Sequence, residues 1–222
     1  FIGGGFISFE FGHIAARAGS EVCMIDRGER PLKGFDADLV ERLVARGEEV
    51  GVQLRRRTSL KSIKKDGTDF LVTVETGSET KDLRADLVVQ GAGRVAAIDQ
   101  LDLAAANVEA GDKGVAVNAY LQSTSNPKIY AAGDAADTQG APLTPVAVFE
   151  GKVAASNMLK GNRTKPDYSG VPSAVFTVPE LTRVGMLEQD AREAGHDIRV
   201  VENDTGDWYS NLRVGESCAA TK

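Results

Sequence analysis

Glycines at the start of the chain are the first residues whose spacing suggests chemistry. Gly3 and Gly5 are followed by Ser8, which gives the pattern Gly-x-Gly-x-x-Ser before a helix-like segment. In a dinucleotide-binding fold the first glycine permits a tight turn, the second lets the backbone approach a pyrophosphate, and a small third residue lets helix and strand pack closely. The alternative is a glycine-rich turn without a ligand. In this context the pattern favours a dinucleotide site.

An aspartate follows at the interval that such a site requires. Asp26 ends the second apolar segment, where a carboxylate can accept a hydrogen bond from a ribose 2′-hydroxyl. A carboxylate repels the 2′-phosphate of NADP, so Asp26 favours NAD. Arg27, Arg30 and Lys33 come directly after it and could hold that phosphate, or could form a solvated basic loop. NAD and NADP therefore both stay open, with NAD favoured.

Composition excludes several classes of function. The chain has 222 residues, with 26 Lys and Arg against 32 Asp and Glu, which gives a net charge of −6. That balance argues against a nucleic-acid partner bound through its phosphates. No apolar run has the length of a membrane span and no signal peptide opens the chain, so we expect a cytoplasmic protein without a membrane partner. Two cysteines and two histidines argue against a disulfide scaffold and against a metal site.

The elements that must position these residues alternate in the first part of the chain. Ile7, Phe11, Ile14 and Ala18 share one face at helical spacing, which predicts a helix over 6–18. A second amphipathic segment, 36–49, predicts another helix. Strands are predicted at 21–25, 59–64, 70–76, 80–83 and 86–90. This order favours a Rossmann-like α/β fold.

The rest of the chain carries weaker signals. Short strands are expected around 115–117 and 129–132 and a helix over 144–159, followed by a polar linker at 162–167. Beyond it we expect a strand at 174–176, a helix at 187–194 and a strand at 198–202. The first residues have the pattern of the end of a strand, so we expect the chain to be part of a longer one.

Four motifs in order give the chain a resemblance to a known family. They are Gly3-Gly4-Gly5-Phe6-Ile7-Ser8-Phe9-Glu10, then Gly91-Ala92-Gly93-Arg94, then Thr124 to Asp134 with Leu143-Thr144-Pro145-Val146-Ala147, and last Val175 to Glu180. In these motifs the chain resembles the pyridine nucleotide–disulfide oxidoreductases, which include glutathione reductase, dihydrolipoamide dehydrogenase and mercuric reductase. The resemblance implies an NAD(P)-binding domain at 1–93, a central segment of an FAD-binding domain at 94–167, and the start of an α+β interface (dimerisation) domain at 168–222.

The resemblance also implies roles for residues of the third motif. Asp134 would accept a hydrogen bond from the ribityl chain of FAD, and Gly133 would let the flavin approach. A helix beginning at Thr144, Pro145 and Ala147 would face the flavin ring, where its N-terminus stabilises negative charge. Taken alone, Asp134 would be an N-cap or turn aspartate, which is the commoner use of Gly-Asp.

Residues of the first two motifs receive roles in the same way. Phe6 matches an aromatic gate over the flavin, or is a core aromatic. Glu10 matches a glutamate that pairs with a lysine beside the flavin and is the one candidate catalytic residue, or it only complements the helix dipole. Gly91 and Arg94 belong to the motif that closes the nucleotide domain and count among the cofactor-binding residues.

The implied function is that of an FAD-dependent NAD(P)H oxidoreductase and homodimer, which passes hydride to the flavin and then electrons to a disulfide or related acceptor. The N-terminal FAD motif, the Cys-x4-Cys pair and the C-terminal His of the family are absent from these residues. Cys23 and Cys218 are no redox pair, and His13 and His196 match structural positions. We therefore expect the chain alone to be inactive and to bind FAD poorly. The alternatives are a non-catalytic dinucleotide-binding module and a single-cysteine relative that reduces oxygen, peroxide or coenzyme A disulfide.

Overall fold

The computed structural model describes residues 1–222, which form two compact units. Unit 1 contains residues 1–93 and 172–222, and unit 2 contains residues 94–171. The segment after 171 thus packs with the first 93 residues. The two units are described separately. No helix in either unit combines the length and apolar character that crossing a membrane requires.

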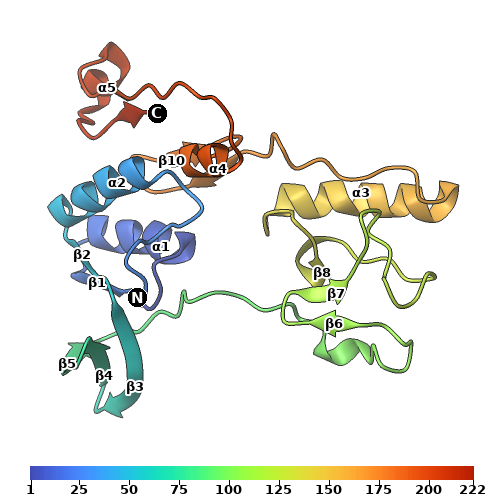
Figure 1. Cartoon of the computed structure of the whole chain (residues 1–222). Helices are drawn as coiled ribbons and strands as arrows, with labels where there is room; N and C mark the ends of the chain where they lie inside the picture. The colour runs from blue at the N-terminus through green and yellow to red at the C-terminus, as the bar shows by residue number, and fades with distance from the viewer. The chain divides into compact units, whose positions relative to one another are not determined.

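Parallel strands form the centre of unit 1 (Figure 1). β1 (Val22–Ile25) pairs with β2 (Val52–Arg55), and Ile2 makes parallel bridges to both Ile25 and Gln90. The predicted strand 86–90 is wrong, because only Gln90 pairs.

Two helices cover these strands (Figure 1). α2 (Ala37–Glu49) begins at Asp36, whose side chain accepts hydrogen bonds from the N–H groups of Asp38 and Leu39. A cap of this kind stabilises a helix by about 1 kcal/mol. Val40 and Leu43 are buried, as the amphipathic pattern predicts.

α1 (Phe6–Arg17) forms as predicted but packs through a different face. Phe11 and Ile14, which belong to the predicted apolar face, are 57% and 59% exposed. The packed face holds Ser8, Phe9, Gly12 and His13. Small residues decide this orientation, since a side chain at Gly12 would overlap the end of Met24.

The other elements of unit 1 are sheets and short helices. The antiparallel meander β3 (Thr58–Asp66), β4 (Asp69–Thr76) and β5 (Glu79–Ala85) confirms the three predicted strands.

β9 (Ser173–Val175) pairs with β10 (Leu181–Arg183), and buried Val175 joins the core of Phe9, Met24 and Val40. After α4 (Glu188–Glu193), the predicted strand 198–202 is wrong, because pairing starts only at β11 (Asn203–Asp204). α5 (Tyr209–Val214) and β12 (Ala220–Thr221) complete the unit, and β11 pairs with β12.

Unit 2 has a small sheet in the order β6 (Ala110–Gly111), β7 (Gly114–Ala116), β8 (Ala136–Asp137). Its long helix is α3 (Thr144–Lys160), and two 3-10 turns are η1 (Asp99–Leu101) and η2 (Gly133–Ala135). Leu121, Val153 and Ala154 form its buried cluster. The predicted strand at 129–132 reduces to one bridge between Gln122 and Tyr130.

Candidate cofactor-binding sites

The glycine turn of unit 1 is fixed between neighbouring strands. The N–H of Gly3 donates to the carbonyl of Ile25 at 2.8 Å, and the N–H of Gly91 donates to Ile2 at 2.8 Å. Gly3 has φ +101°, and a Cβ there would lie 2.7 Å from the backbone of Gly91 and Ala92. Only glycine fits that position, because both its backbone conformation and its close approach exclude a side chain.

The N-terminus of α1 has no capping group from the protein. Gly5 is the N-cap, no side chain accepts from the first turn, and that turn holds no acidic residue. A Cβ on Gly5 would have one neighbour, the carbonyl of Gly91 at 3.7 Å, so the space beside this turn is open. Free N–H groups and the positive end of the helix dipole suit an anion such as a pyrophosphate.

Ser8 occupies the third position of the motif and is fully buried. A side chain at Gly91 would overlap the Ser8 side chain, so the two residues pack against each other. Because both residues are small, α1 approaches the backbone at Gly91 closely, which is the role that the motif gives to its third residue.

Asp26 lies beside the same turn. Its backbone N–H donates to the carbonyl of Arg55 at the end of β2, and its Oδ1 accepts from the N–H of Gly28 at 3.2 Å. Its Oδ2 lies against Gly4, where an added Cβ would overlap it. The fold thus brings the carboxylate to the glycine turn, 22 to 23 residues earlier in sequence, as the motif predicts.

The basic loop after Asp26 is partly engaged within the protein. The Arg30 guanidinium donates to the carbonyl of Lys33 at 2.9 Å, and Arg27 is exposed. The Lys33 Cε lies 3.5 Å from the place of a Cβ on Gly28, the same distance as the Asp26 Oδ2. The Lys33 side chain thus lies near the carboxylate without forming an ion pair with it.

Phe6 and Glu10 are on the first turns of α1. Phe6 is 38% exposed. The Glu10 Oε1 accepts a hydrogen bond from the N–H of Phe176, just after β9, at 2.9 Å. In this structure Glu10 therefore joins α1 to the β9–β10 hairpin. The gate and the lysine pairing stay predictions.

In unit 2 the predicted residues meet around η2. Gly133 has φ +64°, and a Cβ there would lie 2.8 Å from the Cβ of Ala147, on the first turn of α3. The Arg94 guanidinium contacts the Asp134 Oδ2 at 3.1 Å and donates to the carbonyl of Pro142 at 3.0 Å. Arg94 thus joins the Gly133–Asp134 turn to the segment that leads into α3.

The N-terminus of α3, like that of α1, has no side-chain cap. Its N-cap, Leu143, has no side-chain cap, its first turn has no acidic residue, and proline occupies one of the first two positions. Proline is tolerated there because its missing N–H would have no partner in the helix. The remaining free N–H groups lie at the start of α3, where Thr144 and Pro145 were predicted to begin a helix.

Sequence reasoning missed the group that holds η2 from inside. Glu150 on α3 is fully buried, and its Oε2 accepts from the N–H of Gly133 at 2.6 Å. Its Oε1 accepts from the hydroxyls of Thr138 at 2.8 Å and Tyr168 at 2.6 Å. Burial and the bond to Glu150 raise the pKa of Tyr168 to about 12. A single buried glutamate in this mostly apolar helix has no sequence pattern of its own.

The cysteines and histidines take no part in either turn. Cys23 and Cys218 are free, and burial raises the pKa of the Cys218 thiol, which donates to the carbonyl of Arg42 at 3.4 Å. His13 is 1% exposed and both ring nitrogens lack a hydrogen-bond partner. Burial, with Arg17 and Arg46 nearby, lowers the His13 pKa to about 4.

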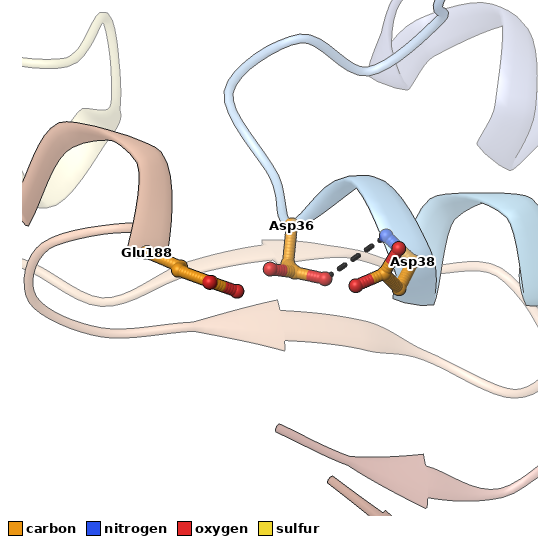
Figure 2. A group of neighbouring side chains, drawn as sticks. All are labelled: Asp36, Asp38 and Glu188. Atoms are coloured by element: carbon orange, nitrogen blue, oxygen red, sulfur yellow. Dashed lines mark hydrogen bonds between the residues drawn. The ribbon is translucent and has the colours of Figure 1, made fainter. Parts of the chain in front are cut away.

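One carboxylate cluster has the spacing of metal ligands. Asp36, Asp38 and Glu188 each offer an oxygen within 4.8 Å of the others, and Figure 2 shows them pointing together between α2 and α4. The Lys222 ammonium lies among them, at 3.0, 2.6 and 2.8 Å respectively. These contacts raise the Lys222 pKa. The cluster therefore binds an internal cation and joins the last residue to both helices.

Comparison with known proteins agrees with this geometry. Residues 1–151 match the family described as pyridine nucleotide-disulphide oxidoreductase. An uncharacterized 19.7 kDa protein in a mercuric resistance operon of Staphylococcus aureus is 51% identical over 55% of this chain and 68% of its own length. A mercuric reductase of Staphylococcus aureus is 35% identical over 89% of this chain and 36% of its own length.

A solved structure shows the same fold. The HOCl-induced flavoprotein disulfide reductase RclA from Escherichia coli, in a Cu(II) complex, has a TM-score of 0.85 at 27% identity. The match covers 99% of this chain and 48% of that protein. The chain thus spans about half of this flavoprotein and about a third of the mercuric reductase. The family match over more than half of the residues shows that the chain belongs to the pyridine nucleotide-disulphide oxidoreductases.

Proposed function

We propose that the protein acts in an FAD-dependent NAD(P)H oxidoreductase that reduces a disulfide or a related small-molecule acceptor. One observation carries the proposal. Each unit places glycine and a carboxylate at the uncapped N-terminus of a helix, with Gly3, Gly5 and Asp26 at α1, and Gly133 and Asp134 at α3. Family membership supports the assignment of these two sites to the two cofactors that family members use.

Unit 1 would bind the pyridine nucleotide. The free N–H groups of α1 suit its pyrophosphate, and Gly3 and Gly5 leave room for the backbone to approach it. Asp26 would accept a hydrogen bond from the adenosine ribose, which favours NAD. Arg27 and Lys33 flank the carboxylate and keep NADP as the second candidate.

Unit 2 would contribute part of the FAD site. Its residues fit that group, since Asp134 offers an acceptor for ribityl hydroxyls and the free N–H groups of α3 suit a ring that gains negative charge. When bound, FAD would supply the capacity to accept hydride from a nicotinamide and to release the electrons to an acceptor. Gly133, Arg94 and Ala147 hold the turn and helix in place. Phe6 and Glu10 are proposed to act beside the flavin.

Homodimerisation is part of the same proposal. Residues 168–222 would supply the start of the dimer interface, as the family resemblance implies. Equilibrium sedimentation of the purified protein over a range of concentrations tests this, and a monomer throughout would remove the dimer from the proposal.

The visible spectrum tests the proposal directly. We expect the chain joined to the N-terminal FAD motif and redox cysteines of a family member to retain flavin absorbance after incubation with FAD, and to bleach when NADH is added without oxygen. The chain alone should bind FAD poorly. Asp134→Ala should lower FAD affinity about tenfold, the loss of one hydrogen bond from a charged acceptor. Asp137→Ala, at an exposed position of β8, is the matched control and should leave it unchanged.

The outcomes separate the candidate functions. A protein that binds NADH but never FAD supports the non-catalytic dinucleotide-binding module. A flavoprotein that NADH bleaches and oxygen or coenzyme A disulfide reoxidises, but a dithiol substrate does not, supports the single-cysteine relatives. Asp134→Ala with full FAD affinity would overturn the role of Asp134.

A further inference from the structure

Glu150 is a buried carboxyl group that the proposed chemistry does not use. It is 0% exposed, on the side of α3 that faces η2. Its three partners are a backbone amide and two hydroxyl groups, with no lysine or arginine among them. Burying a carboxyl group without a cation is costly unless every acceptor is satisfied. A leucine or alanine at this position of α3 could be buried without the desolvation cost of a carboxyl group. The presence of a glutamate with three hydrogen bonds therefore needs an explanation.

The one hydrogen bond from the Glu150 side chain to the backbone is made to the turn that holds Asp134. The N–H of Gly133 donates to the Glu150 Oε2 at 2.6 Å, and Asp134 is the next residue. Glu150 lies three residues after Ala147, so both lie on the same face of α3. Ala147 lies against Gly133 from one turn of α3, and Glu150, on the next turn of α3, accepts a hydrogen bond from the Gly133 N–H.

Further contacts fix Glu150 itself. Tyr168 and Thr138 both donate to Oε1, and the Thr138 hydroxyl also accepts from the N–H of Gly140 at 3.2 Å. Gly140 packs directly over this network, since a Cβ there would lie 2.7 Å from the Glu150 Oε1. The Glu150 side chain therefore has one available position.

We propose that Glu150 is a positioning residue for flavin binding. It holds the Gly133–Asp134 turn from inside through the Gly133 N–H, while Arg94 contacts Asp134 from the exposed side. This inference rests on the proposed function, because it assumes that Asp134 binds FAD. Glu150 acts through Gly133 and does not touch the cofactor.

Two substitutions separate reach from charge. Glu150→Asp keeps the charge but is one methylene shorter and does not reach the Gly133 N–H. Glu150→Gln loses the charge but keeps the reach: its amide oxygen accepts from Gly133, and its NH2 donates to the two hydroxyl oxygens. Tyr168→Phe removes one partner of Oε1 and leaves the Gly133 bond intact, so it is the matched control for loss of stability.

Titration of each purified protein with FAD, followed by flavin fluorescence, is the first test. We expect the dissociation constant to rise at least about tenfold in Glu150→Asp and to stay within about threefold in Glu150→Gln and Tyr168→Phe. A loss of FAD affinity in Glu150→Gln that Glu150→Asp does not share would overturn the inference, because charge rather than reach would then be the cause. If Glu150→Asp does not fold, Glu150→Met, of similar length without an acceptor, replaces it.

A measurement without flavin separates this inference from the proposed function. The Gly133 amide proton should exchange slowly and resonate downfield in the wild-type and Glu150→Gln proteins, and lose both properties in Glu150→Asp. If wild type binds no FAD, the flavin role proposed for Asp134 fails while this readout still tests whether Glu150 holds the turn. A Gly133 amide that exchanges alike in all variants overturns the positioning role.

Discussion

Replacing Gly133 by alanine tests the close contact between η2 and α3. Gly133 has φ +64°, and the new Cβ would lie 2.8 Å from the Cβ of Ala147. A left-handed conformation costs an L-residue roughly 1–2 kcal/mol, and crowding in a packed region costs roughly 1–3 kcal/mol. Alanine also lowers the conformational entropy of the unfolded chain, which raises the unfolding free energy by roughly 0.4–1 kcal/mol. Gly133→Ala should therefore lower the unfolding free energy of unit 2 by roughly 2–4 kcal/mol.

A second glycine in the same unit provides the control. Gly151 is inside α3, and a Cβ there would meet no atom within 4 Å. Gly151→Ala should stabilise unit 2 by roughly 0.5–1 kcal/mol, since alanine is the better helix former. Adding Ala147→Gly to the Gly133→Ala protein should remove the crowding between the two Cβ atoms. The part of the lost unfolding free energy that comes from backbone strain at position 133 should remain.

Urea unfolding followed by hydrogen exchange of unit 2 amides measures these differences. Trp208, the single tryptophan, lies in unit 1 and reports on that unit alone, so its transition should not move. A Gly133→Ala protein as stable as wild type would show that η2 does not lie against Ala147. A loss that Ala147→Gly fails to reduce would assign the whole effect to backbone strain.

Three further predictions concern unit 1. Asp26→Ala should weaken binding of NADH more than of NADPH, measured by calorimetric titration of both nucleotides, and an equal or opposite change would remove the preference for NAD. Because the His13 pKa is about 4 when folded and 6.5 when unfolded, the unfolded state binds more protons between these values. The unfolding free energy of unit 1 should therefore fall by up to about 3 kcal/mol as the pH falls from 6.5 to 4. Urea unfolding should show a weaker pH dependence in His13→Phe, but not in the exposed control His196→Gln. An unchanged pH dependence in His13→Phe would contradict the lowered pKa of His13. Lys222→Met should leave Asp36 and Asp38 without their cation, and Glu188 with Arg192 alone. It should lower protection of the β11–β12 amides against hydrogen exchange by roughly 1–3 kcal/mol, whereas unchanged protection would show that the cluster does not hold Lys222.

Local patterns predicted α2 and the antiparallel meander of unit 1. The amphipathic spacing in α2 and the strand signals in β3, β4 and β5 correspond to structure formed by neighbouring residues. The glycine turn and Asp26 could be predicted as well, because the motif encodes a strand, a turn and a helix in one short segment.

Prediction failed where packing partners lie far apart in sequence. On α1, hydrophobicity favoured the face with Phe11 and Ile14, but close approach to β1 selected the face with Ser8 and Gly12. Side-chain volume outweighed apolar character there. Glu150 is similar, since its partners are 10 or more residues away and meet only when η2 packs on α3.

The contact between Gly4 and Asp26 links two positions that a motif search treats as independent. In the pattern Gly-x-Gly the middle residue is free to vary, yet here any side chain at position 4 would overlap the Asp26 carboxylate. We therefore expect the two positions to covary among related chains, with bulkier residues at position 4 only where position 26 lacks a carboxylate. An attempt to change nucleotide preference at position 26 consequently also frees position 4 for redesign.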